Sequence, residues 1–290
     1  PAFTSAALAG MTSAQLNAMA TAAATALTSV QVPGLATAAL AGLSTTDIAG
    51  LSTGVIAALT TAQVMALGTA QVAAMTTAGV RAFTTAQVRA LTTAQIANLT
   101  TTEVQALTST EIGALTSAQV NALVTAEAAA LTSSQAPAFT SAALAGMTSA
   151  QLNAMATAAA TALTSTQMPG LATAALAGLS TTDIAGLANS AVAALTTTQT
   201  MALGTAQVAA MTTGQVAALK TDQIRALTTA QIANLTTTEV QALTTAEIAA
   251  LTSAQVNALT TAEAAALTST QAPAFTSAAL AGMTSAQLNA

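Results

Sequence analysis

The side chains that could do chemistry in this 290-residue chain are carboxylates, and they recur at a regular spacing. The chain has nine Asp and Glu residues, four Lys and Arg residues, and no His, Cys, Tyr or Trp. Eight of the nine acids are separated by multiples of eight residues: Asp47, Glu103, Glu111, Glu127, Asp183, Glu239, Glu247 and Glu263. Acids eight residues apart, such as Glu103 and Glu111, could align on neighbouring turns of a coiled chain and bind Ca²⁺, which prefers carboxylate oxygens.

A structural role explains these acids better, because they replace Gln one for one in a repeating pattern. Without His or Cys, the chain also lacks the usual general base, the thiolate nucleophile and the soft metal ligands. The net charge of −5 is thinly spread, which argues against nucleic acid or an anionic membrane as a partner. The sequence therefore predicts no enzyme, and no catalytic, metal or cofactor site.

The elements that would position these acids follow a strict eight-residue period. Every eighth residue from Phe3 to Met283 is Leu, Met or Phe, which gives 36 positions in register without exception. Such a period indicates a one-dimensional array of small units that contact only their neighbours. We number the octads from this residue, so that the octad 91–98 runs from Leu91 at position 1 to Asn98 at position 8.

Each octad carries the signature of a helix start. Position 2 is mostly Thr and position 5 mostly Gln or Glu, the spacing of a capping box, and the apolar residues at positions 1 and 6 match a hydrophobic staple. Octads with Ala at position 2 also have Ala at position 5, as a reciprocal interaction predicts. Acids at position 5 would lie in the first helical turn, where the helix dipole favours them. The predicted capping residues are exemplified by Thr92, Gln95, Thr100, Glu103, Thr108 and Glu111.

These signals predict an all-α fold, a tight α-solenoid of very short helices with one helix per octad. A β-solenoid is the alternative, although Ala at positions 4, 7 and 8 favours helix over strand. A single octad buries too little apolar surface to offset its conformational entropy, so neighbouring octads must supply the stability. Position 1 supplies the predicted core, exemplified by Phe3, Leu27, Leu59, Phe83, Leu91, Leu99, Phe139 and Leu227.

The five prolines do not fit a regular helix in every octad. All of them occupy position 7, where proline removes a backbone hydrogen-bond donor. Either the helix ends early in those octads, or the helix limits differ from those assigned above.

A longer period is superimposed on the octads. Residues 1–136 and 137–272 align without a gap and differ at 21 positions, and residues 273–290 repeat residues 1–18. The sequence therefore predicts one continuous octad array over residues 1–290, made of two superunits and a partial third, and cut from a longer array. No run of about 18 apolar residues exists, so no membrane-spanning segment is predicted.

The octad Leu-Thr-Thr-Ala-Gln-Val/Ile-x-Ala resembles the octapeptide arrays of very long bacterial surface or secreted proteins, some labelled haemagglutinin-like or haem-utilisation-like. The resemblance implies an extracellular or cell-surface location and a structural or adhesive role. A haem site finds no support, since the chain has no His or Cys ligand.

Together these observations predict an extracellular or cell-surface filament, sheath or stalk that associates with itself, with surface glycans as a further partner. The alternative function is a Thr ladder on a β-solenoid that binds ice or carbohydrate. Adjacent Thr-Thr pairs count against that alternative, because only one residue of each pair can face a given side of a strand.

Overall fold

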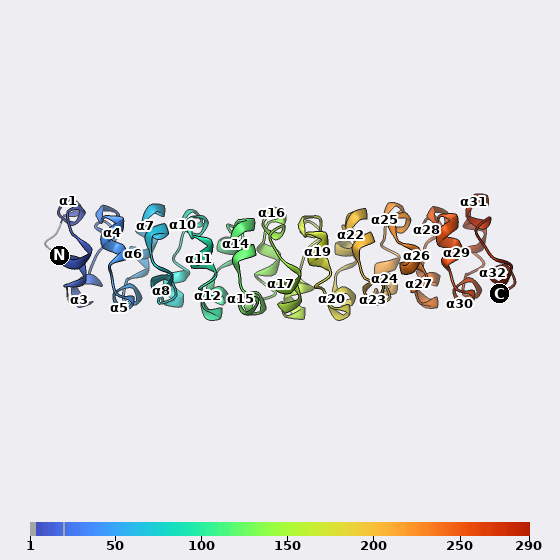
Figure 1. Cartoon of the computed structure of the whole chain (residues 1–290), viewed down its shortest axis with the longest axis horizontal. Coiled ribbons are helices and arrows are strands. Elements are labelled where there is room, and N and C mark those ends of the chain that lie inside the picture. Colours follow the sequence, from blue (N-terminus) through green and yellow to red (C-terminus); the bar gives the residue numbers. More distant parts are fainter. Residues whose placement is uncertain (1–3, 20) are drawn as a thin grey trace. The chain divides into compact units, whose positions relative to one another are not determined.

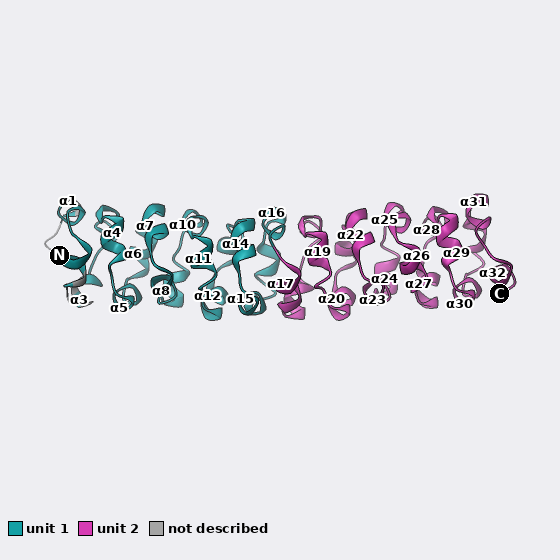
Figure 2. Ribbon diagram, in the orientation of Figure 1, with its two compact units in different colours: residues 1–146 teal, residues 147–290 magenta. Residues whose placement is uncertain are grey.

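The computed structural model describes residues 4–19 and 21–290, and every regular element in these ranges is a helix. The chain divides into two compact units, residues 1–146 and 147–290 (Figure 2). The predicted all-α solenoid is confirmed, and the β-solenoid alternative is wrong because the described residues contain no strand. Phe3 lies outside the described residues.

The helices follow one another at octad intervals in both units. Unit 1 contains α1 (Ser5–Ala9), α2 (Ser13–Asn17), α3 (Thr21–Ala24), α4 (Thr37–Ala41), α5 (Thr45–Ala49), α6 (Thr53–Ala58), α7 (Thr61–Ala66), α8 (Thr69–Val72), α9 (Thr77–Val80), α10 (Thr85–Ala90), α11 (Thr93–Ile96), α12 (Thr101–Ala106), α13 (Ser109–Ile112), α14 (Ser117–Ala122), α15 (Thr125–Ala130) and α16 (Ser141–Leu144). Unit 2 contains α17 (Ser149–Ala154), α18 (Thr157–Ala160), α19 (Thr173–Leu176), α20 (Thr181–Gly186), α21 (Asn189–Val192), α22 (Thr197–Ala202), α23 (Thr205–Val208), α24 (Thr213–Val216), α25 (Thr221–Ala226), α26 (Thr229–Ile232), α27 (Thr237–Ala242), α28 (Thr245–Ala250), α29 (Ser253–Ala258), α30 (Thr261–Ala265), α31 (Ser277–Leu280) and α32 (Ser285–Leu288). Four 3-10 segments replace the α-helix in the proline octads: η1 (Val32–Gly34), η2 (Ala136–Ala138), η3 (Met168–Gly170) and η4 (Ala272–Ala274).

Two extended residues separate one helix from the next. Between α10 and α11, Leu91 has φ −55° and ψ 132°, and Thr92 has φ −71° and ψ 157°. No described residue has a positive φ, so the chain turns without a left-handed glycine. The break arises because Thr92 caps a new helix at its first turn, while Leu91 turns its side chain into the core.

Helices that start three octads apart pack side by side within each unit. In unit 1, α4, α7 and α10 follow one another in this way, and each starts 24 residues after the previous one (Figure 1). The same relation joins α22, α25 and α28 in unit 2. Three successive octads therefore make one turn of the solenoid, which we call a coil turn. Helices this short are unstable alone in water, so the packing between coil turns stabilises them.

The core of each unit consists of the side chains at positions 1 and 6. Among the predicted core residues, Leu59, Phe83, Leu91 and Leu227 are each 4% exposed, and Leu27, Leu99 and Phe139 are also buried. The position-6 residues Val64 and Ile96 are at most 1% exposed. Thr200 takes the place of a Val at position 6 and is completely buried.

Proline shortens its helix without moving its start. Gln31 still accepts the N–H of Thr28 at 2.9 Å, and the N–H of Val32 still bonds to Thr28 O. Pro33 has no N–H to continue the α-helical pattern, and the chain goes on as a 3-10 turn in which Gly34 N–H bonds to Gln31 O. Of the two alternatives for the proline octads, the early end is the correct one.

The octad after a proline octad approaches its neighbouring coil turn closely. A Cβ on Gly146 would collide with the carbonyl of Ser117, and a Cβ on Gly178 would collide with that of Ser149. Only glycine fits at these two positions.

None of the helices in the described ranges has the length and apolar character needed to cross a membrane.

Candidate functional site

The capping box predicted from the octad spacing is present in the structure. Thr92 N–H donates to Gln95 Oε1 at 2.7 Å, and Gln95 N–H donates to Thr92 Oγ1 at 3.2 Å. In the next two octads the carboxylates of Glu103 and Glu111 take the place of this amide. Glu103 accepts the N–H of Thr100 at 2.6 Å, and Glu111 accepts that of Thr108 at the same distance.

The amide of Gln95 has a second role that its own octad does not reveal. Its Nε2 donates to Val64 O at 2.8 Å and to Leu67 O at 2.7 Å. These carbonyls belong to the end of α7 and the residue after it, where a helix leaves acceptors without intrahelical partners. One side chain therefore caps the start of its own helix and the end of a helix in the previous coil turn.

This bond recurs along both units, and we call the series the amide ladder. In each case the amide at position 5 donates to carbonyls 31 and 28 residues earlier, the latter at 2.5–2.9 Å. The donors are Gln63, Gln71, Gln87, Gln95, Gln119 and Gln135 in unit 1, and Gln199, Gln207, Gln215, Gln223, Gln231, Gln255, Gln271 and Gln287 in unit 2.

Sequence reasoning missed the ladder, although the composition of position 5 contains a signal for it. Position 5 is Gln in 18 octads and Glu in only six. A capping box alone accepts either residue, and the helix dipole favours the charged one. The excess of Gln indicates that this position needs a donor as well as an acceptor.

Six of the eight acids at position 5 leave one buried oxygen without a partner. All eight are buried, and none is more than 4% exposed. Six buried carboxylate oxygens have no hydrogen-bond partner: Asp47 Oδ1, Glu103 Oε1, Glu111 Oε1, Glu127 Oε1, Asp183 Oδ1 and Glu239 Oε1. In the described ranges, no group of three or more Asp and Glu side chains could hold a metal ion together.

Burial raises the pKa of several of these glutamates. Desolvation and, to a smaller extent, the nearby charge of Glu103 together raise the pKa of Glu127 to about 7, against the hydrogen bond from Val124 N–H. Desolvation likewise raises the pKa of Glu103, against the hydrogen bonds from Thr100. The pKa of Glu111 is also raised by burial, although Thr108 and Arg81 counter the shift.

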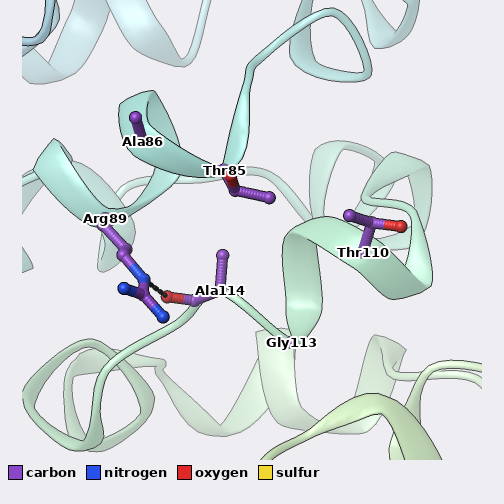
Figure 3. Close-up of a pocket in the computed structure, with 6 residues that line it drawn as sticks. All are labelled: Thr85, Ala86, Arg89, Thr110, Gly113 and Ala114. Atoms are coloured by element: carbon purple, nitrogen blue, oxygen red, sulfur yellow. Dashed lines mark hydrogen bonds between the residues drawn. The ribbon is translucent and has the colours of Figure 1, made fainter.

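The surface offers shallow grooves between coil turns, and one of them lies beside Arg89 (Figure 3). Arg89 crosses the groove, and its Nε donates to Ala114 O at 3.3 Å. The other lining residues include Thr85, Thr110 and Gly113, so the groove contains no carboxylate and no activated nucleophile. The arrangement suits contact between coil turns better than chemistry.

The comparison with known families matches the repeats themselves. A family model described as the ALTTAQ repeat matches residues 40–77, 64–101, 77–109, 192–221, 201–237, 213–245 and 237–269, together just over half of the chain. No curated protein and no solved structure is similar enough to the chain to match it.

Proposed function

The chain belongs to the ALTTAQ repeat family, and on this basis we propose that it is a structural repeat protein and not an enzyme. In this proposal it forms a filament, sheath or stalk by stacking octads and by associating with further copies. The location outside the cell or at its surface is part of the proposal, and rests on the resemblance of the octad to the arrays of long bacterial surface and secreted proteins.

The amide ladder is the observation that carries the proposal. The position-5 amide makes the same bonds to an earlier coil turn at many points along both units, so the same stacking contact is used repeatedly. A fold in which each octad is stabilised only by neighbouring octads can be lengthened by adding further octads. Its function then scales with the number of octads, as expected of a protein that spans a distance.

The surface composition supports association between copies. The position-5 acids are buried, and the exposed charged side chains are Arg81, Arg89, Lys220, Asp222 and Arg225. Much of the remaining exposed surface consists of Thr, Ser and Ala. Met65 and Met201, which correspond in the two superunits, are 55% and 51% exposed. Weak repulsion and scattered apolar side chains favour contact between identical surfaces.

Electron microscopy and sedimentation of the full chain test this function. We expect particles that associate side by side or end to end as the concentration increases. A chain lengthened by a further copy of residues 137–272 should give particles longer by a constant increment. Monodisperse monomers at every concentration would contradict the self-association, and a particle length independent of the added copy would contradict the stacking.

The proposed location requires a separate experiment. Intact cells that produce the protein are treated with a protease, and the octad array is followed with an antibody. Loss of the array from intact cells supports a surface location. An array degraded only after lysis would place the protein inside the cell and overturn that part of the proposal.

A further inference from the structure

Each bond of the amide ladder requires a hydrogen-bond donor at position 5, because its partners are carbonyl oxygens. An ionised carboxylate at this position has no proton to donate. In Gln95 the two ends of the amide have fixed roles, because Oε1 accepts from Thr92 and Nε2 donates to Leu67 and Val64. Glutamate has the same shape with an oxygen in place of this nitrogen. An ionised glutamate at position 5 would direct a negative oxygen at two carbonyl oxygens, which repel it.

Glu127 shows this arrangement most clearly. Its Oε2 accepts the N–H of Val124 at 2.6 Å, and its Oε1 is buried without a partner. In the ladder, the position-5 side chain faces the carbonyls 31 and 28 residues earlier. For Glu127 Oε1 these are the carbonyls of Ile96 and Leu99. In the Gln octads the amide nitrogen fills the same place, and in Gln95 it lies 2.7–2.8 Å from the carbonyl oxygens. The space therefore suits a hydrogen-bonding proton and not an additional metal ion.

Four glutamates share the buried, unpartnered oxygen, and we call them the ladder glutamates: Glu103, Glu111, Glu127 and Glu239. We propose that the ladder glutamates are proton-binding sites, which stabilise the array when they are neutral and loosen it when they ionise. The neutral acid donates its O–H to the carbonyls of the previous coil turn, as the Gln amide does elsewhere. The device goes beyond the structural role proposed above and does not depend on filament formation.

The charged groups around the ladder glutamates of unit 1 are few. Glu127 on α15 packs against α12, which carries Glu103, and α11, which contains Ile96, has no titratable side chain. Glu103 in turn meets Glu127 and packs against α9, which ends next to Arg81. Glu111 on α13 meets the charge of Arg81 and packs against α10, which carries Arg89. The negative charge of Glu103 favours the protonated form of Glu127, whereas the positive charge of Arg81 favours the ionised form of Glu111.

In unit 2, Glu239 is in a similar environment. Its helix α27 packs against α30, which carries Glu263, and against α24, which has no titratable side chain. Burial raises the pKa of Glu239, against hydrogen bonds from Thr236, and the charge of Glu263 adds to the rise. Like-charged neighbours in adjacent coil turns thus favour the neutral form in both units.

The direction of the pH effect follows from these shifts. A carboxyl whose pKa is higher in the folded than in the unfolded chain stabilises the fold fully below the unfolded pKa, and this stability is lost as the pH rises through the folded pKa. For Glu127 the window runs from 4.5 to about 7. Over this window the unfolding equilibrium constant should increase on the order of a hundredfold for this group alone.

The test compares the full chain with a variant in which all four ladder glutamates are changed to Gln. Thermal unfolding is measured between pH 4.5 and pH 8. We expect the melting temperature of the original chain to fall as the pH rises through this range. The variant should show a clearly smaller fall and melt at a higher temperature at pH 8. It carries the residue that half of the octads already have, so it is expected to fold.

Asp222→Asn is the matched control, because Asp222 is exposed and lies outside position 5. This variant removes a negative charge but should keep the pH dependence of the original chain. Infrared spectra should also show protonated carboxyl groups at pH 5.5 that the four-Gln variant lacks. An unchanged melting temperature between pH 4.5 and pH 7, an equal slope in the four-Gln variant, or fully ionised glutamates at pH 5.5 would each overturn the proposal.

Discussion

The side-chain nitrogen of Gln95 lies 2.7 Å from the carbonyl oxygen of Leu67, a residue 28 positions earlier in the chain. This bond joins the start of α11 to the residue that follows the end of α7. It converts a local helix cap into a tertiary contact, so capping and stacking depend on the same side chain. Substitutions at this position should therefore affect the stability of the array more than substitutions elsewhere on the helix surface.

Gln95→Ala should destabilise the chain by about 2–4 kcal/mol, because it removes the capping acceptor and leaves two buried carbonyls without this donor. Chemical denaturation measures the change. Gln105→Ala is the control, since Gln105 is exposed at position 7, and its loss should change the stability by no more than about 0.5 kcal/mol. Equal effects of the two substitutions would contradict the ladder as a source of stability.

The contribution of the N-caps can be tested by removing one cap and by adding another. Thr92→Ala should cost about 1 kcal/mol, whereas Thr93→Ala at the exposed first helical position should be nearly neutral. Ala188 caps α21 without a side-chain hydrogen bond, while the corresponding Ser52 makes one. Ala188→Ser should therefore stabilise unit 2 by about 0.5–1 kcal/mol in thermal unfolding. A destabilising Ala188→Ser would show that the missing cap is not a weakness of this octad.

Thr200→Val should raise stability by about 1 kcal/mol. The hydroxyl of Thr200 is fully buried and bonds only locally, to Thr196 O at 3.0 Å, whereas the corresponding residue of the other superunit is Val64, which is equally buried. Replacing the hydroxyl by a methyl group fills the same volume without burying a polar atom. The exposed Thr198→Val, measured in the same melts, should have little effect, and a loss of stability in Thr200→Val would refute the prediction.

Gly79 and Ile56 should be energetically coupled. A Cβ on Gly79 would lie 2.7 Å from Ile56 Cδ1, and in the other superunit the corresponding residues are Gln215 and Val192. Gly79→Gln should therefore stabilise α9 only when Ile56→Val makes room for it. A double-mutant cycle should give a coupling energy of about 1 kcal/mol, and strict additivity would exclude the contact as its cause.

Changing Gly to Ala should have opposite effects on stability at Gly146, where coil turns approach closely, and at Gly54, where they do not. Gly146→Ala should destabilise unit 1 by about 1–3 kcal/mol, because the new methyl group meets the carbonyl of Ser117. Gly54→Ala, in a helix and with nothing within 4 Å of its added methyl, should stabilise the chain by about 0.5–1 kcal/mol. The two melting temperatures should move in opposite directions, and a shift of the same sign would contradict the close approach.

The parts of the fold that depend on a single octad could be predicted from the sequence. Thr92 and Gln95 are three residues apart, so their capping box and the helix they start are both local. The partner of Gln95 Nε2 could not be predicted, because the number of octads in a coil turn is not written in any one octad. The choice between an early helix end and a shifted helix at Pro33 also needed the structure, which shows the box of Thr28 and Gln31 intact.

The ladder has a direction, since each glutamine donates to carbonyls that precede it in the chain. During synthesis, those carbonyls leave the ribosome before the glutamine does. A new octad can therefore dock onto a surface that has already formed, and it closes a loop of only ~30 residues, for which the entropic cost is modest. Folding can keep pace with translation, and the time an octad needs to fold does not grow with the length of the protein.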